Sequence, residues 1–81
     1  MAGNSPIRYA KLKRALLRGG AEEGSINGSH HNWRYKGMNQ SIPVHRNLVK
    51  ARYVVRLRKA WKLRSEDGVS DKDFWNGNWG P

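Results

Sequence analysis

The sequence contains no cysteine and few acidic residues, with 6 Asp plus Glu against 16 Lys plus Arg. The absence of cysteine excludes disulfides, thiolate metal sites and cysteine nucleophiles. No window approaches the roughly 20 apolar residues that a membrane-spanning helix needs. We therefore expect a soluble, cytoplasmic protein, and at 81 residues the chain has room for one small domain.

Charge is unevenly distributed along the chain, which carries a net charge of +10. Residues 1–64 hold 15 basic and 2 acidic side chains, whereas residues 65–81 have a net charge of −3. A basic body of this kind attracts polyanions, of which nucleic acid is the commonest in a cytoplasm. The alternative is a basic surface that serves only solubility or membrane contact. We divide the chain into a basic domain, residues 1–64, and an acidic, aromatic-containing tail, residues 65–81.

Two segments have the apolar spacing of amphipathic helices. The first follows a predicted N-cap at Ser5 and is expected over residues 6–18, ending at Gly19. The second follows a predicted N-cap at Asn47 and continues to Leu63. Its apolar stripe recurs every four residues at Val49, Tyr53, Leu57 and Trp61. Each helix needs a partner to cover its stripe.

The residues between the helices alternate with the period of strands. Along residues 29–36, one face would carry His31, Trp33 and Tyr35, and the other His30, Asn32, Arg34 and Lys36. Residues 40–45 place Ile42 and Val44 on one face, and a weaker strand is expected over residues 21–26. These patterns predict an α+β domain of order α-β-β-β-α, in which both helices cover one face of a three-stranded antiparallel sheet.

The turn between the second and third strands decides which residues face each other. A two-residue type II′ turn at Gly37-Met38 would pair Trp33 with Ile42 and His30 with His45. A four-residue turn would keep the same faces but separate these two histidines.

His30 is the candidate catalytic residue. An imidazole that titrates near neutral pH can remove the proton from a ribose 2′-hydroxyl, and nearby cations can stabilise charge on the phosphate. An exposed histidine on a basic face is, however, more often a phosphate contact. The residues that we expect to bind nucleic acid are Ser29, Asn32, Arg34, Lys36, His45 and Arg46. His31 is expected to be structural. We expect no metal, because adjacent strand residues point to opposite faces and no carboxylate lies near the histidines in sequence, and no cofactor.

The motif GSHHNWRYKG, followed by SIPVHRN and a basic amphipathic helix, resembles the HicA toxin family over about residues 6–63. The resemblance implies a double-stranded-RNA-binding-domain-like fold, metal-independent cleavage of mRNA and neutralisation by a HicB-like antitoxin. It also assigns the functional histidine to His30, the residue that the alternation of faces selects. The competing hypotheses are a non-catalytic RNA-binding module and a degenerate toxin that only binds its antitoxin.

The tail after Arg64 combines acidic residues with Phe74, Trp75 and Trp79. Its acids are typical of a disordered segment, whereas its aromatic residues favour docking on its own domain or on another chain. Its charge suggests that it lies on the basic body, where it would shield the RNA-binding face or contribute to the antitoxin interface.

Overall fold

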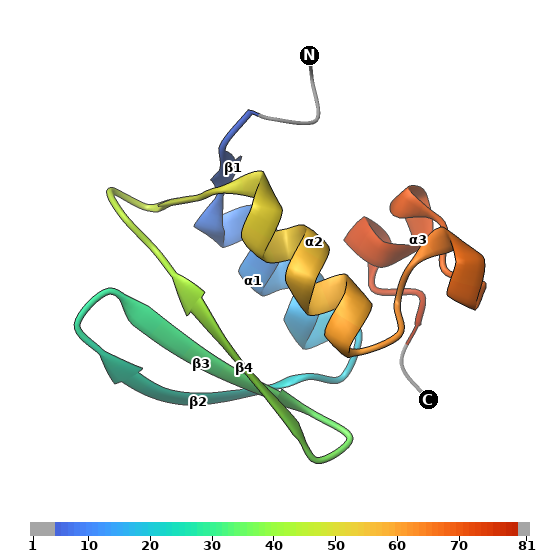
Figure 1. Cartoon of the computed structure of the whole chain (residues 1–81), viewed down its shortest axis with the longest axis horizontal. Coiled ribbons are helices and arrows are strands. Elements are labelled where there is room, and N and C mark those ends of the chain that lie inside the picture. Colours follow the sequence, from blue (N-terminus) through green and yellow to red (C-terminus); the bar gives the residue numbers. More distant parts are fainter. Residues whose placement is uncertain (1–4, 80–81) are drawn as a thin grey trace.

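A computed structural model describes residues 5–79 and confirms the predicted α+β architecture (Figure 1). The central elements are α1 (Tyr9–Arg18), β2 (Glu22–Asn27), β3 (His30–Tyr35), β4 (Met38–Pro43) and α2 (Ala51–Ala60). The additional elements are β1 (Ile7–Arg8), β5 (Leu48–Val49), the 3-10 helix η2 (Ser65–Asp67) and α3 (Asp71–Asn76). None of the helices within residues 5–79 is long and apolar enough to cross a membrane.

Strands β2, β3 and β4 form an antiparallel sheet in sequence order, with α1 and α2 on the same side of it (Figure 1). The predicted alternation of β3 is confirmed, because Trp33 and Tyr35 are buried toward the helices while His30 and Arg34 are exposed. The other large buried side chains of the core are Leu12, Leu16, Ile42, Leu57, Trp61, Leu63 and Phe74. The core therefore contains both helical stripes and one face of the sheet.

The predicted N-caps at Ser5 and Asn47 are wrong, because a short β-ladder precedes both helices. Ile7 pairs with Val49 in this antiparallel ladder of β1 and β5, and the first helical residues are Tyr9 and Ala51. The Asn47 carbonyl accepts a hydrogen bond from the Tyr9 amide at 2.9 Å. Val49, which is fully buried, thus enters the core from a strand and not from the helix.

The predicted turn at Gly37-Met38 is also wrong. Lys36 and Gly37 are the two turn residues, and Tyr35 pairs with Met38. The φ angles of Lys36 and Gly37, 48° and 79°, are the positive values of a type I′ turn, whose twist matches that of the flanking strands. The register consequently moves by two residues, which preserves both faces but changes every partner.

The tail docks on its own domain, which is one of the alternatives expected for it. Phe74 is fully buried, and the Trp79 ring lies 5.0 Å from the Tyr35 ring. The Trp79 ring also occupies the space that a side chain at Gly19 would need, since a Cβ there would lie 2.1 Å from it. Gly19 therefore ends α1 and also makes room for the tail. The contacts of α3 are chiefly with α1, so the tail lies on the basic body at its helices.

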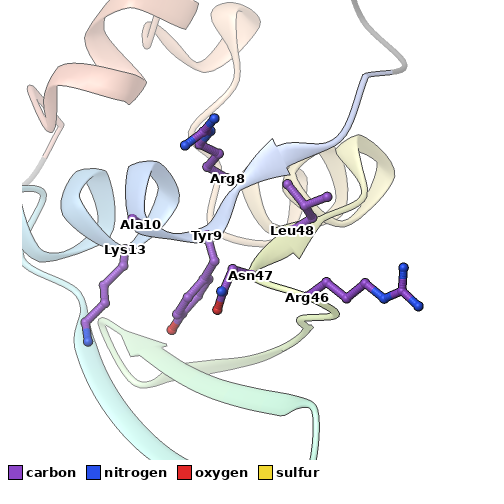
Figure 2. A pocket seen from close by; sticks show the side chains of 7 residues that line it. All are labelled: Arg8, Tyr9, Ala10, Lys13, Arg46, Asn47 and Leu48. Atoms are coloured by element: carbon purple, nitrogen blue, oxygen red, sulfur yellow. The ribbon is translucent and has the colours of Figure 1, made fainter.

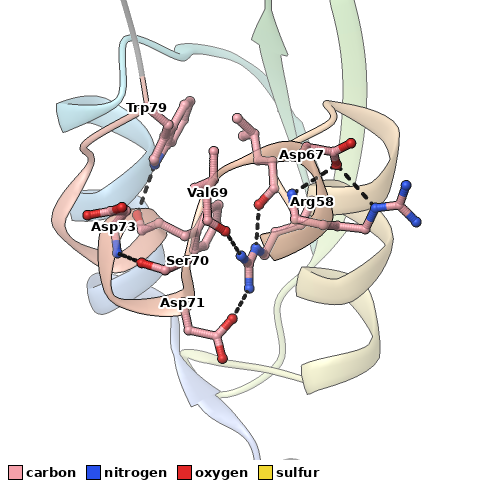
Figure 3. A network of polar contacts seen from close by, with 10 residues as sticks. Arg58, Asp67, Val69, Ser70, Asp71, Asp73 and Trp79 are labelled. Carbon is pink, nitrogen blue, oxygen red and sulfur yellow. Dashed lines mark hydrogen bonds and ion pairs between the residues drawn. The ribbon is translucent and has the colours of Figure 1, made fainter.

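Arg58 of α2 anchors this tail (Figure 3). Its guanidinium donates hydrogen bonds to the carbonyls of Leu63 at 2.8 Å and Val69 at 2.9 Å, and it pairs with the Asp71 carboxylate. It also lies 4.9 Å from the centroid of the Phe74 ring. One arginine side chain thereby fixes the turn after α2 and the start of α3 together.

We predict that Phe74→Ala lowers the free energy of unfolding by about 3–5 kcal/mol, since it leaves a cavity beneath the docked tail. Urea denaturation followed by tryptophan fluorescence measures this change. Val55→Ala is the control, because Val55 is 62% exposed on α2 and its truncation is expected to change stability by less than about 0.5 kcal/mol. Equal effects of the two substitutions would contradict the docking of the tail.

Candidate functional site

The face of the sheet opposite the helices carries polar side chains from two adjacent strands. The outward residues are His30, Asn32 and Arg34 of β3 and Asn39, Ser41 and Pro43 of β4. None of these six residues is buried. This surface, which we call the polar face, can therefore meet a large substrate without rearrangement.

His30 begins β3 and lies opposite Pro43 of β4 and Asn27 of β2. Its Nδ1 is 3.3 Å from the Ser41 hydroxyl oxygen, which is within hydrogen-bond range. A serine hydroxyl can donate or accept, so it can accompany either tautomer of the imidazole. The contact orients the ring and leaves Nε2 as the nitrogen that can exchange a proton with a bound substrate.

His45 is not the partner of His30, so the predicted pairing of these histidines is wrong. His45 forms a bridge with Leu48, with hydrogen bonds of 3.0 and 2.9 Å between their backbones. Arg46 and Asn47 form the turn between them, with φ angles of 53° and 64°. The two-residue change of register moves His45 past the end of β4. Pro43 takes the position opposite His30 that the predicted register gives to His45, and the Ser41 hydroxyl is the polar group that contacts the imidazole.

The other predicted site residues are spread along the hairpin. Ser29 is adjacent to His30, and its carbonyl accepts a hydrogen bond from the Val44 amide at 2.7 Å. Asn32 donates to the carbonyl and the hydroxyl oxygen of Ser25, both at 3.1 Å. These side chains belong to the His30 end of the polar face.

Arg34 and Lys36 lie farther from His30 than we expected. At about 3.3 Å per strand residue, Arg34 is about 13 Å away along β3, and its Cα partner on β2 is Glu22. Lys36 occupies the hairpin turn, about 20 Å from His30 by the same rise, and its Nζ lies 5.3 Å from the centroid of the Tyr35 ring. Lys36 therefore does not contribute charge beside the imidazole.

A groove of about 480 Å³ runs along the β2 side of the polar face. Its lining includes Ser25, Asn32, Arg34 and Asn39, and the Glu22 and Glu23 carboxylates make one end of it acidic. The alternation of the strands identifies Ser41 and Asn39 as outward residues, but only the correct register shows which of them contacts His30.

Half of the Lys and Arg residues lie on α1 and α2. The exposed cations there are Lys11, Arg14 and Arg18 of α1 and Arg52, Arg56 and Lys59 of α2. Within residues 5–79, the cations in ion pairs are Lys13, Arg58 and Arg64. The remaining cations are available to a polyanion.

A second cavity, of about 630 Å³, lies between the start of α1 and the turn before β5 (Figure 2). The Tyr9 ring and Asn47 border its centre, while the side chains of Arg8 and Arg46 extend away from it. Arg46 therefore lines this cavity and does not lie on the polar face.

The interior side of β3 explains His31. The Tyr9 hydroxyl accepts a hydrogen bond from Trp33 Nε1 at 3.2 Å, and the His31 ring packs 4.7 Å from the Tyr9 ring. His31 therefore belongs with the aromatic residues of the helix-facing side, as expected, and its buried Nδ1 has no hydrogen-bond partner among residues 5–79.

Comparison with protein-family models, with curated proteins and with solved structures finds no match for this chain.

The structure predicts that two tyrosines titrate differently. Arg52 donates a hydrogen bond to the Tyr53 hydroxyl at 3.4 Å, and this contact and the arginine charge lower the pKa of Tyr53 below its usual 10.0. Burial raises the pKa of Tyr9 above that value. We expect the ultraviolet absorbance of tyrosinate to show Tyr53 ionising before Tyr9, and Arg52→Met to raise the pKa of Tyr53.

Arg14→Met on α1 is the matched control and should leave this titration unchanged. Tyr53→Phe assigns the transition, because it removes the phenol. A first transition that persists in Tyr53→Phe would show that another tyrosine ionises first.

Proposed function

We propose that this protein is the toxin of a type II toxin–antitoxin system, a HicA-like mRNA interferase that cleaves RNA without a metal ion. The observation that carries the proposal is His30, an exposed imidazole oriented by Ser41 on the open polar face. The motif around His30 and the α-β-β-β-α order support the same proposal.

In the proposed reaction, His30 Nε2 accepts the proton of a ribose 2′-hydroxyl. The 2′-oxygen then forms a bond to phosphorus, the bond from phosphorus to the 5′-oxygen breaks, and the leaving oxygen takes a proton from water or from protonated His30. The products are a 2′,3′-cyclic phosphate and a 5′-hydroxyl. DNA lacks the attacking hydroxyl and is not a substrate.

Around His30, the polar groups that can hold the substrate are mostly neutral. Asn32 and Ser29 can offer hydrogen bonds near the reacting phosphate, and Arg34 can contact the strand farther along β3. The exposed cations of α1 and α2 would attract RNA over a longer range. Binding is therefore shared between hydrogen bonds at the polar face and charges on the helices.

We further propose that the toxin acts in the cytoplasm on mRNA and that a HicB-like antitoxin neutralises it by covering the polar face. The double-stranded-RNA-binding-domain-like fold is part of the same proposal, supported by two helices on one side of a three-stranded antiparallel sheet. No cofactor is required for the chemistry described.

A second candidate is a non-catalytic RNA-binding module. The exposed cations of α2 favour it, because Arg52, Arg56 and Lys59 can contact phosphates without any contribution from the polar face. A degenerate toxin that retains only antitoxin binding would share the same structure.

The test is cleavage of single-stranded RNA in EDTA by the wild type and by His30→Ala. A general base contributes about 10²- to 10⁴-fold to rate, so we expect His30→Ala to lower the cleavage rate by this factor. Products should end in 2′,3′-cyclic or 3′-phosphate, detected by mass spectrometry. Asn76→Ala is the control, because Asn76 is exposed on α3 and takes no part in the site.

Equal cleavage by wild type and His30→Ala would exclude His30 as the catalytic residue. RNA binding without cleavage by either protein would instead support the non-catalytic module. Unchanged urea midpoints in both variants would show that the comparison concerns folded protein.

A further inference from the structure

A small apolar recess adjoins the polar face where β4 ends. It has a volume of about 190 Å³ and lies between the β4 end, the turn before β5 and the first turn of α2. The residues that line it are Pro6, Pro43, His45, Leu48, Lys50 and Tyr53. The rings of Pro43 and Tyr53 and the Leu48 side chain supply apolar walls, and His45 and Lys50 line the recess chiefly with their carbon atoms.

The size of the recess restricts what it can hold. Pockets for drug-sized ligands measure about 300–1,000 Å³, so this one suits a single planar ring system. Almost wholly apolar walls with an aromatic ring suit the face of a nucleobase. Leu48 is 40% exposed, which leaves the recess open to solvent.

The recess is adjacent to His30. Pro43 lines it and is also the cross-strand partner of His30, and directly opposed Cα atoms lie about 4.5–5.5 Å apart. A base in the recess would therefore belong to a nucleotide next to the phosphate at His30. The two sites share one strand end.

The charge around the recess indicates a polyanion as the source of that ring. Lys50 lines it, Arg52 is adjacent to Tyr53, and Arg46 lies in the turn beside it. All three are exposed, and within residues 5–79 none of them forms an ion pair. No Asp or Glu lines the recess.

We propose that this recess binds one nucleobase of the RNA strand and thereby selects which phosphate reaches His30. The selection of a phosphate for cleavage rests on the proposed function, whereas base binding itself does not require cleavage. It assigns Tyr53 to base stacking and gives His45, which is expected from the sequence to contact nucleic acid, a place in the apolar wall of the recess.

The test measures binding of short oligoribonucleotides in which every 2′-hydroxyl is methylated, so that His30 has no proton to remove. A series carries one abasic nucleotide at each position in turn, with the number of phosphates constant. Since one stacked base contributes about 1–3 kcal/mol, one position in the series should weaken wild-type binding about 5- to 150-fold. Fluorescence anisotropy of a labelled oligonucleotide gives the affinities.

Tyr53→Ala should bind the intact oligonucleotide as weakly as wild type binds the sensitive abasic one, whereas Tyr53→Phe retains the ring and should bind as wild type does. Leu48→Ser is the second variant. Because Leu48 is partly exposed, this substitution is expected to destabilise the fold less than Tyr53→Ala does. Leu17→Ser is its matched control, since Leu17 is 50% exposed on α1 and does not line the recess.

Equal affinity for every abasic oligonucleotide would overturn the proposal. An acidic peptide that competes at the recess in the absence of any base dependence would assign it to a protein partner and overturn it as well. Base-dependent binding by a protein that does not cleave RNA would support base binding in the recess and contradict the proposed nuclease function. Failure of one proposal can therefore be distinguished from failure of the other.

Discussion

Burial of Trp33 and Tyr35 on one side of β3 is the constraint that orients the candidate site. Both are at most 4% exposed, and each also donates a hydrogen bond, from Trp33 to the Tyr9 hydroxyl and from Tyr35 to the Trp79 carbonyl. The strand is thus fixed to the start of α1 and to the tail at once. Because strand side chains alternate, this attachment forces His30 outward, and slippage by one residue would bury it.

The hydrophobic periods of the sequence predict the faces of the fold well but not its register. Strand and helix patterns reflect which side chains are buried, and the pattern correctly identifies Trp33, Ile42 and Leu57 as core residues. Turns at Gly37-Met38 and at Lys36-Gly37 leave the same residues buried, so the pattern cannot choose between them. The position of the turn depends on positive φ angles and on strand twist. A lysine at the first turn position does not indicate a positive φ angle from sequence. Two-residue strands such as β1 and β5 are too short to have a period.

The site was predictable to the same extent. Alternation alone places His30 on the polar face, whereas its neighbour depends on register, and the structure provides Ser41 in place of His45. The tail shows a different limit. Its acidic composition is typical of disorder, yet the Trp79 ring packs in the space left by the missing side chain of Gly19. Composition does not predict a steric fit of this kind.

Under the proposed function, the distribution of charge separates the attraction of RNA from the chemistry at His30. Three tail carboxylates, those of Glu66, Asp67 and Asp71, pair with Arg58 and Arg64 near the end of α2. They therefore leave the outward cations of both helices unneutralised. On the polar face beside His30, by contrast, the hydrogen-bonding groups of Ser29, Asn32 and Ser41 are neutral, and the cations of that strand end lie around the recess. A polyanion would therefore be concentrated by the helices but oriented by short-range contacts at the polar face. Long-range attraction is nonspecific. In the proposed reaction, the selection of one phosphate therefore requires a contact that depends on shape, and the recess beside Pro43 is the contact that we propose.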